Sequence, residues 1–169
     1  MIKRCLYITA LQIILLMGLS SGQNLSISDI RKDFKIGHKD EDKCKAHLEA
    51  LAKHADSPVE RGYEAAYHMF MAKHSGNPLK KMSYFKDGKK MLDKEISANP
   101  NNVELRYIRL LIQFYTPSYL GYRGNIEEDK DFLMNNLYKI KDREAKQIIF
   151  NYLKGAKMYS EQELALLGR

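Results

Sequence analysis

The sequence predicts an all-α protein built from stacked antiparallel helix pairs, and three observations predict this fold class. Apolar side chains recur at the three- and four-residue spacing of amphipathic helices along most of the chain. All four prolines stand where a helix is expected to begin or to have just ended. No segment between hairpin turns alternates strictly between apolar and polar residues, as a half-buried strand would. We therefore expect a single helical domain over residues 23–169.

The helices follow from their apolar stripes and from the residues that cap them. The stripes mark helical segments near residues 40–55, 58–75, 79–98, 103–115, 132–140 and 148–153. Three pairs have the spacing of a capping box, in which a Glu follows the N-cap by three residues: Ser57 with Glu60, Asn125 with Glu128, and Ser160 with Glu163. Further N-caps are expected at Asn77, Asn102 and Asp142.

Residues 1–22 are predicted to be a cleaved signal peptide and not part of the domain. Lys3 and Arg4 precede an apolar run that ends at Leu19, and small residues follow it. The run is shorter than the ~20 residues that a membrane-spanning helix needs, so an uncleaved anchor is the weaker alternative. We place the cut between Gly22 and Gln23. The mature chain is then periplasmic or secreted, with no transmembrane helix.

Composition excludes several classes of protein. The 169 residues include 44% apolar and 29% charged residues, which excludes a collagenous or wholly disordered chain. The two cysteines are too few for a disulfide-dense scaffold, and cleavage of the signal leaves Cys44 alone. The formal charge of +7 falls to +5 once Lys3 and Arg4 are removed. Because lysines and acidic residues mix along the helices, we predict no nucleic-acid partner.

The helix starts near Pro58, Asn102 and Asp142 are regularly spaced, each followed by a second helix. The junction Asn99–Asn102 resembles the junction between tetratricopeptide repeats, although the spacing exceeds the 34 residues of that repeat. We therefore expect a tetratricopeptide-like, short α-solenoid.

A longer segment resembles small, uncharacterised, signal-bearing helical proteins of Gram-negative bacteria. The resemblance covers residues 99–137, about a quarter of the chain. Its residues are Asn99-Pro100, Glu104 to Arg109, Gln113, Pro117, Tyr119 to Tyr122, Asn125-Ile126 and Asp129-Lys130. It implies export and a helical fold, and it implies no activity.

The segment 103–115 is apolar around most of its circumference, which is typical of a central, buried helix. Arg106, Arg109 and Gln113 fall within about 60° of one another and form a narrow polar stripe. In one interpretation the stripe faces solvent or pairs with the acidic residues 127–129. In the other it faces a groove, where the guanidinium groups bind carboxylates of a peptide.

The loop after this helix contains two tyrosines, Tyr119 and Tyr122, that could border the groove with both an apolar face and a hydroxyl. Alternatively, Tyr119 and Leu120 pack beneath the turn, and the glycines permit its bends. The leading hypothesis is a non-enzymatic helical-repeat protein that binds a peptide or protein partner in the cell envelope around residues 103–123. The alternative is a small envelope enzyme with a pocket around Arg106, Arg109, Tyr119 and Tyr122.

Catalytic and metal signatures are weak, so we predict no catalytic residue, no cofactor and no metal ion. The pattern Gly-x-Ser-x-Gly at residues 18–22 lies in the signal peptide. The pattern Ser-x-x-Lys at Ser83–Lys86 lacks the partner motifs of penicillin-recognising enzymes. Cys44, His47 and His54 could share a helix face, but no fourth zinc ligand is indicated.

Overall fold

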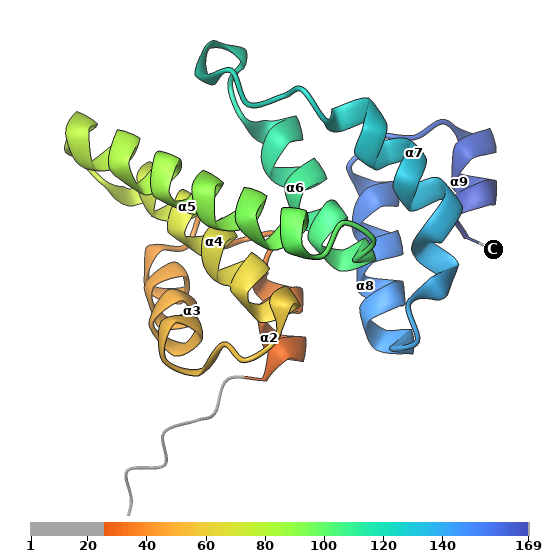
Figure 1. Cartoon of the computed structure of the whole chain (residues 1–169), viewed down its shortest axis with the longest axis horizontal. Helices are drawn as coiled ribbons and strands as arrows, with labels where there is room; N and C mark the ends of the chain where they lie inside the picture. The colour runs from red at the N-terminus through yellow and green to blue at the C-terminus, as the bar shows by residue number, and fades with distance from the viewer. Residues whose placement is uncertain (1–25, 169) are drawn as a thin grey trace, which may run out of the picture.

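The computed structural model describes residues 26–168, and within this range the protein is all-α, as predicted (Figure 1). The predicted signal peptide and its cut between Gly22 and Gln23 lie outside the described residues. Eight α-helices and two 3₁₀ helices (η) make up this part of the chain. They are α2 (Ile27–Asp33), α3 (Glu41–His54), α4 (Pro58–His74), α5 (Pro78–Ala98), α6 (Val103–Tyr115), η1 (Ser118–Leu120), α7 (Ile126–Asn136), η2 (Leu137–Lys139), α8 (Arg143–Gly155) and α9 (Glu161–Leu167).

Most helix starts are capped by the residues that the sequence marks. The Ser57–Glu60 and Ser160–Glu163 pairs form complete capping boxes. Side chains at Asn77, Asn102 and Asp142 accept hydrogen bonds from the first backbone N–H groups of their helices. The expected Asn125–Glu128 capping box is wrong, because Asn125 makes no side-chain cap bond. Its side chain binds Gln113 and Glu128 instead.

The antiparallel pair α4–α5 has the most extensive helix–helix contact in the described chain. Gly88 of α5 allows this close approach, since a Cβ at that position would lie 2.5 Å from the carbonyl oxygen of Ala65. Helix α3 packs on α4, and α6 packs against α4, α5 and α7. In Figure 1, α5 and α6 spread apart from the turn that joins them, so the start of α5 and the end of α6 are well separated.

The predicted helix-pair repeat is not confirmed. The pairs α4–α5 and α6–α7 do pack together, but α9 packs mainly on α7, and α2 packs on α8. The N-terminal helix of the described chain therefore contacts the C-terminal third directly. Such a contact joins segments far apart in the sequence, which a simple stack of successive pairs does not do.

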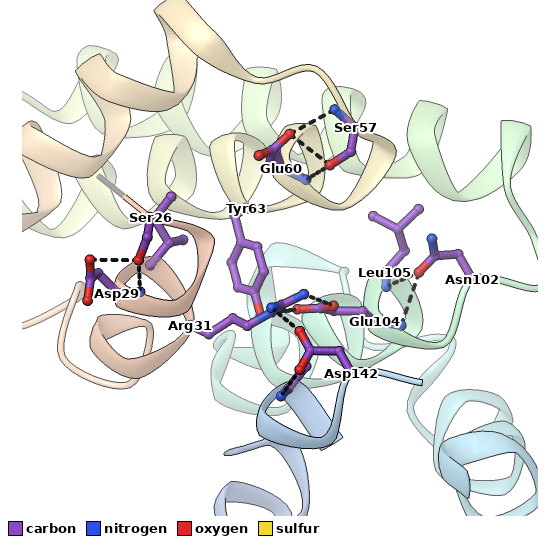
Figure 2. Close-up of polar contacts among 12 residues, drawn as sticks. Ser26, Asp29, Arg31, Ser57, Glu60, Tyr63, Asn102, Glu104, Leu105 and Asp142 are labelled. Carbon is purple, nitrogen blue, oxygen red and sulfur yellow. Dashed lines mark hydrogen bonds and ion pairs between the residues drawn. The ribbon is translucent and has the colours of Figure 1, made fainter. Parts of the chain in front are cut away.

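A partly buried ion-pair cluster fixes this contact (Figure 2). Arg31 of α2 donates two hydrogen bonds to Glu104 of α6, at 2.7 and 2.9 Å, and a third to Asp142 at the start of α8, at 2.9 Å. The Tyr63 hydroxyl of α4 donates to Glu104 at 2.9 Å. Four helices thus meet at one arginine–carboxylate pair, whose bidentate geometry fixes their relative orientation.

The core is rich in aromatic side chains. Tyr63, Tyr67 and Tyr107 are fully buried, and the Phe34 ring contacts all three. The contacts with Tyr63 and Tyr67 are edge-to-face, a geometry that adds to the favourable free energy of burial. Among residues 26–168, no helix has the length and apolar character needed to cross a membrane.

Candidate functional site

The side of α6 that bears the arginines is covered by α7. Arg109 donates two hydrogen bonds of 2.7 Å to Asp129, whose side chain is fully buried. Arg106 lies 2.6 Å from Glu128 and 3.0 Å from Asp129, and its guanidinium stacks 4.7 Å above the Phe132 ring. Both arginines are therefore neutralised by carboxylates of the same chain, the first of the two interpretations of the stripe.

Ionisation of the two carboxylates reflects their surroundings. Hydrogen bonds from Asn125 and Arg106 lower the pKa of Glu128. Burial raises the pKa of Asp129, and the hydrogen bonds and charge of Arg109 oppose that rise. Asp129 therefore depends on the arginines to remain ionised inside the protein.

Gln113 and Tyr122 belong to the same closed region. Gln113 is fully buried, and it exchanges hydrogen bonds of 3.1 and 3.0 Å with the side chain and backbone N–H of Asn125. The Tyr122 hydroxyl donates to Asp93 of α5 at 2.8 Å. Burial, followed by this hydrogen bond, raises the pKa of Tyr122. Neither side chain is available to a ligand without rearrangement.

The structure therefore does not bring the five predicted ligand residues together. Arg106, Arg109, Gln113 and Tyr122 lie in a buried polar region between α5, α6 and α7. Tyr119 lies apart from them, on η1, with 84% of its surface exposed.

An open apolar cleft lies on the other side of α6. It has a volume of about 500 Å³, within the range of typical ligand sites. The end of α4, the start of α5 and the end of α6 form its walls, with the turn after α2 and η1 at its edges. Its apolar lining includes Phe34, Met69, Phe70, Met82, Phe85, Leu111, Ile112, Tyr115, Tyr119 and Leu120. We call this site the apolar cleft.

Large side chains are exposed at the apolar cleft to an unusual degree. Six large hydrophobic residues are exposed in the described chain, and Met82, Tyr115 and Tyr119 of these line the cleft. An exposed apolar surface gathered in one concave site is typical of a binding surface, whereas scattered exposed residues are not. Four lining residues carry a hydroxyl group: Tyr115, Thr116, Tyr119 and Tyr152. The Thr116 hydroxyl already donates to the carbonyl oxygen of Ile112 at 2.6 Å.

Two of the three candidate metal ligands, Cys44 and His47, have structural partners instead, and His54 is exposed at the end of α3. Cys44 is buried and lies 3.5 Å from the carbonyl oxygen of Tyr67, and burial raises the pKa of its thiol to about 12. His47 bonds Asp33 at 3.1 Å. Within residues 26–168, no group of three or more His, Cys, Asp or Glu side chains has the geometry for a metal ion.

Sequence reasoning missed the apolar cleft because it treated the apolar residues of α6 only as core. It also missed Arg31 as a partner of Glu104. The one available signal for that pair was an acidic residue on an otherwise apolar helix, which implies a partner cation elsewhere in the chain.

Comparison with protein-family models, with curated proteins and with solved structures finds no match. The resemblance of residues 99–137 to exported helical proteins of Gram-negative bacteria therefore stays a prediction. What the site can bind follows from its own geometry and chemistry.

Proposed function

We propose that the protein is an exported, non-enzymatic binding protein whose apolar cleft holds a peptide segment of a partner in the cell envelope. The observation that carries the proposal is the open cleft of about 500 Å³ with exposed Met82, Tyr115 and Tyr119 on its walls. The cleft borders the 103–123 segment from its apolar side, so the arginines of α6 have no part in binding.

The chemistry of the walls favours a peptide. Apolar side chains provide surface against which two or three large peptide side chains can pack. The exposed hydroxyls of Tyr115 and Tyr119 can pair with peptide backbone groups, which are costly to bury unpaired. Aromatic residues that combine an apolar face with a hydroxyl are common in binding surfaces for this reason.

Fluorescence tests the proposal directly, since the chain contains no Trp. The probe is a peptide of about ten residues with blocked ends, one Trp, one Leu and one Phe among Ser and Gly. We expect a saturable blue shift of the Trp emission on binding. Tyr119→Ser should weaken the affinity about fivefold, because an aromatic contact contributes about 1 kcal/mol.

Tyr138→Ser is the matched control, because Tyr138 is also an exposed tyrosine on a 3₁₀ helix but does not line the cleft. Equal loss of affinity in both variants would contradict the site. A wild-type dimer in sedimentation that Met82→Glu converts to a monomer would instead make the cleft a contact between two copies.

Export has its own test. N-terminal sequencing of the protein from fractionated Gram-negative cells should give Gln23 as the first residue in the periplasmic or extracellular fraction. A chain that retains Met1 and stays in the cytoplasm would contradict the predicted signal peptide.

A further inference from the structure

A second cleft of about 740 Å³ adjoins the apolar cleft. Three residues, His38, Tyr115 and Tyr152, line both clefts and therefore lie where the two clefts meet. The turn after α2 forms one wall of the second cleft, and α8 forms the other. We call it the basic cleft, for the following reason.

Charge is sharply segregated along the two clefts. No Asp or Glu of the described chain lines either of them, although the sequence contains 21 acidic residues. The cationic lining residues are Lys73 and Lys81 in the apolar cleft and Arg31, Lys32, Lys35 and Lys39 in the basic cleft. A concave surface lined by one sign of charge concentrates the opposite charge in a ligand.

Of the four cations of the basic cleft, two are already neutralised by carboxylates and two are not. Arg31 pairs with Glu104 and Asp142, and Lys32 lies 2.7 Å from Glu144. Lys35 and Lys39 are exposed, and neither forms an ion pair within 4.0 Å with another residue of the described chain. Their ammonium groups are therefore available to an anionic ligand.

His38 lies where the two clefts meet, and the direction of its pKa shift reflects the positive charges around it. Burial lowers its pKa, and the positive charges of Lys73, Lys39 and His74 lower it further. Lys39 lies on the same turn, while Lys73 and His74 come from the end of α4. Cations from two separate elements therefore lie close to the place where the apolar and basic clefts meet.

We propose that the protein selects partner segments in which large apolar residues adjoin carboxylates, with the apolar residues in the apolar cleft and the carboxylates at Lys35 and Lys39. The carboxylates are Asp or Glu side chains or the free C-terminus of the partner. This inference rests on the proposed peptide-binding function and adds the charge of the ligand. An acyl chain with a carboxylate shares this chemistry, but it offers no backbone groups to the exposed hydroxyls of Tyr115 and Tyr119.

Three peptides that share the Trp, Leu and Phe core and differ only at one end test the inference. One end is neutral, one carries two Asp and a free carboxylate, and one carries two Lys and a blocked end. At low salt we expect the acidic peptide to bind about tenfold more tightly than the neutral peptide, and the basic peptide more weakly than both. About 1 M salt should remove most of the difference, because it screens exposed charges.

The double variant Lys35→Glu/Lys39→Glu should abolish the preference for the acidic peptide and leave the affinity for the neutral peptide unchanged. Lys90→Glu/Lys94→Glu is the matched control, since these exposed lysines of α5 line neither cleft and their reversal changes the net charge equally. The control variant should keep at least most of the preference.

Each failure points to a different conclusion. Equal binding of the neutral and acidic peptides overturns the charge selection but leaves the peptide-binding function intact. A preference that survives Lys35→Glu/Lys39→Glu overturns the assignment to the basic cleft. Displacement of the peptides by dodecanoate, with no preference for the acidic peptide, makes the ligand an acyl chain. No saturable shift with any of the three peptides contradicts the proposed function itself.

Discussion

The two sides of α6 differ in what covers them, although both belong to one largely buried helix. On one side, Arg106 and Arg109 meet Glu128 and Asp129 of α7, and every charge has a partner. On the other side, Leu111, Ile112 and Tyr115 line a cleft that no element of the described chain fills. The charged side therefore belongs to the packed interior, and the apolar side borders an open cleft.

The difference shows that residue type alone does not indicate function. An arginine on a buried helix must find a carboxylate, because an unpaired buried charge is very costly. Here the partner comes from the next helix, so the charge is satisfied within the chain. Exposed apolar side chains in a cleft find no partner within the described chain, and burying them is favourable.

The largest effect is expected on stability, when the ion pairs between α6 and α7 are broken. Asp129→Asn removes the carboxylate from two arginines, so it should lower the free energy of unfolding by about 3 kcal/mol. Urea denaturation followed by circular dichroism measures this. Asp131→Asn is the control, because Asp131 is an exposed residue of the same helix with no ion pair to a described residue. Equal stability of the two variants would show that the buried pair contributes little.

A charge introduced into the apolar cleft should weaken ligand binding and change the free energy of unfolding only slightly. Met82→Glu places a carboxylate on the wall of the apolar cleft and should weaken binding of the neutral Trp peptide about thirtyfold. Unfolding should change little, since Met82 is 40% exposed. Leu166→Glu serves for comparison, because Leu166 is 43% exposed on α9 and lies outside the cleft. Undiminished titration of the Met82→Glu variant by fluorescence would remove the cleft as the binding site.

Arg106→Ala tests in a single variant whether the arginine side of α6 contributes to stability alone or also to peptide binding. It removes the ion pairs with Glu128 and Asp129 and the stacking on Phe132, so unfolding should become easier by about 1 kcal/mol. Affinity for the neutral and acidic peptides should stay within about twofold of the parent, because Arg106 does not line the cleft. A selective loss of acidic-peptide binding in the folded variant would restore the arginine stripe as a ligand site.

The smallest effect concerns pH. A bound carboxylate near His38 favours the protonated imidazole, so binding takes up a proton and becomes tighter as the pH falls. Because the pKa of His38 is lowered from its usual value of 6.5, the change should occur below that pH. We expect about a threefold gain in acidic-peptide affinity between about pH 7 and pH 5.5.

His38→Gln should abolish the gain, and the neutral peptide should not respond to pH in the parent. The same lowered pKa makes the unliganded fold less stable as the pH falls below about 6.5, since the unfolded chain then binds more protons at His38. A pH response that persists in His38→Gln would show that another group is responsible.

Local signals predicted the helices well because their causes are local. Ser57, Asn102 and Asp142 cap their helices, since a cap needs only backbone N–H groups two or three residues away. Asn125 is an exception, because its side chain does not cap α7. Its cap signal is as clear in sequence, but Gln113 from another helix takes its side chain, and no local pattern contains that competitor.

The predicted site shows the same limit. The stripe Arg106, Arg109 and Gln113 was placed correctly on one face of a buried helix. Which element covers that face depends on how α7 packs, and the sequence left both interpretations open. Tertiary packing also decides where the two loop tyrosines lie. Tyr122 turns inward to Asp93, and Tyr119 stays exposed at the cleft.

The sequence by itself determined the all-α class, the bounds of α3 to α6 to within one residue, and the near-complete burial of α6, because these follow from spacing and capping along a few consecutive residues. Only the tertiary structure decided that Arg31 joins α2 to α6 and α8, that the arginines of α6 are neutralised, and that an apolar cleft adjoins a basic one. These features join residues up to 111 positions apart, and long-range packing brings such residues together without leaving a periodic pattern in the chain.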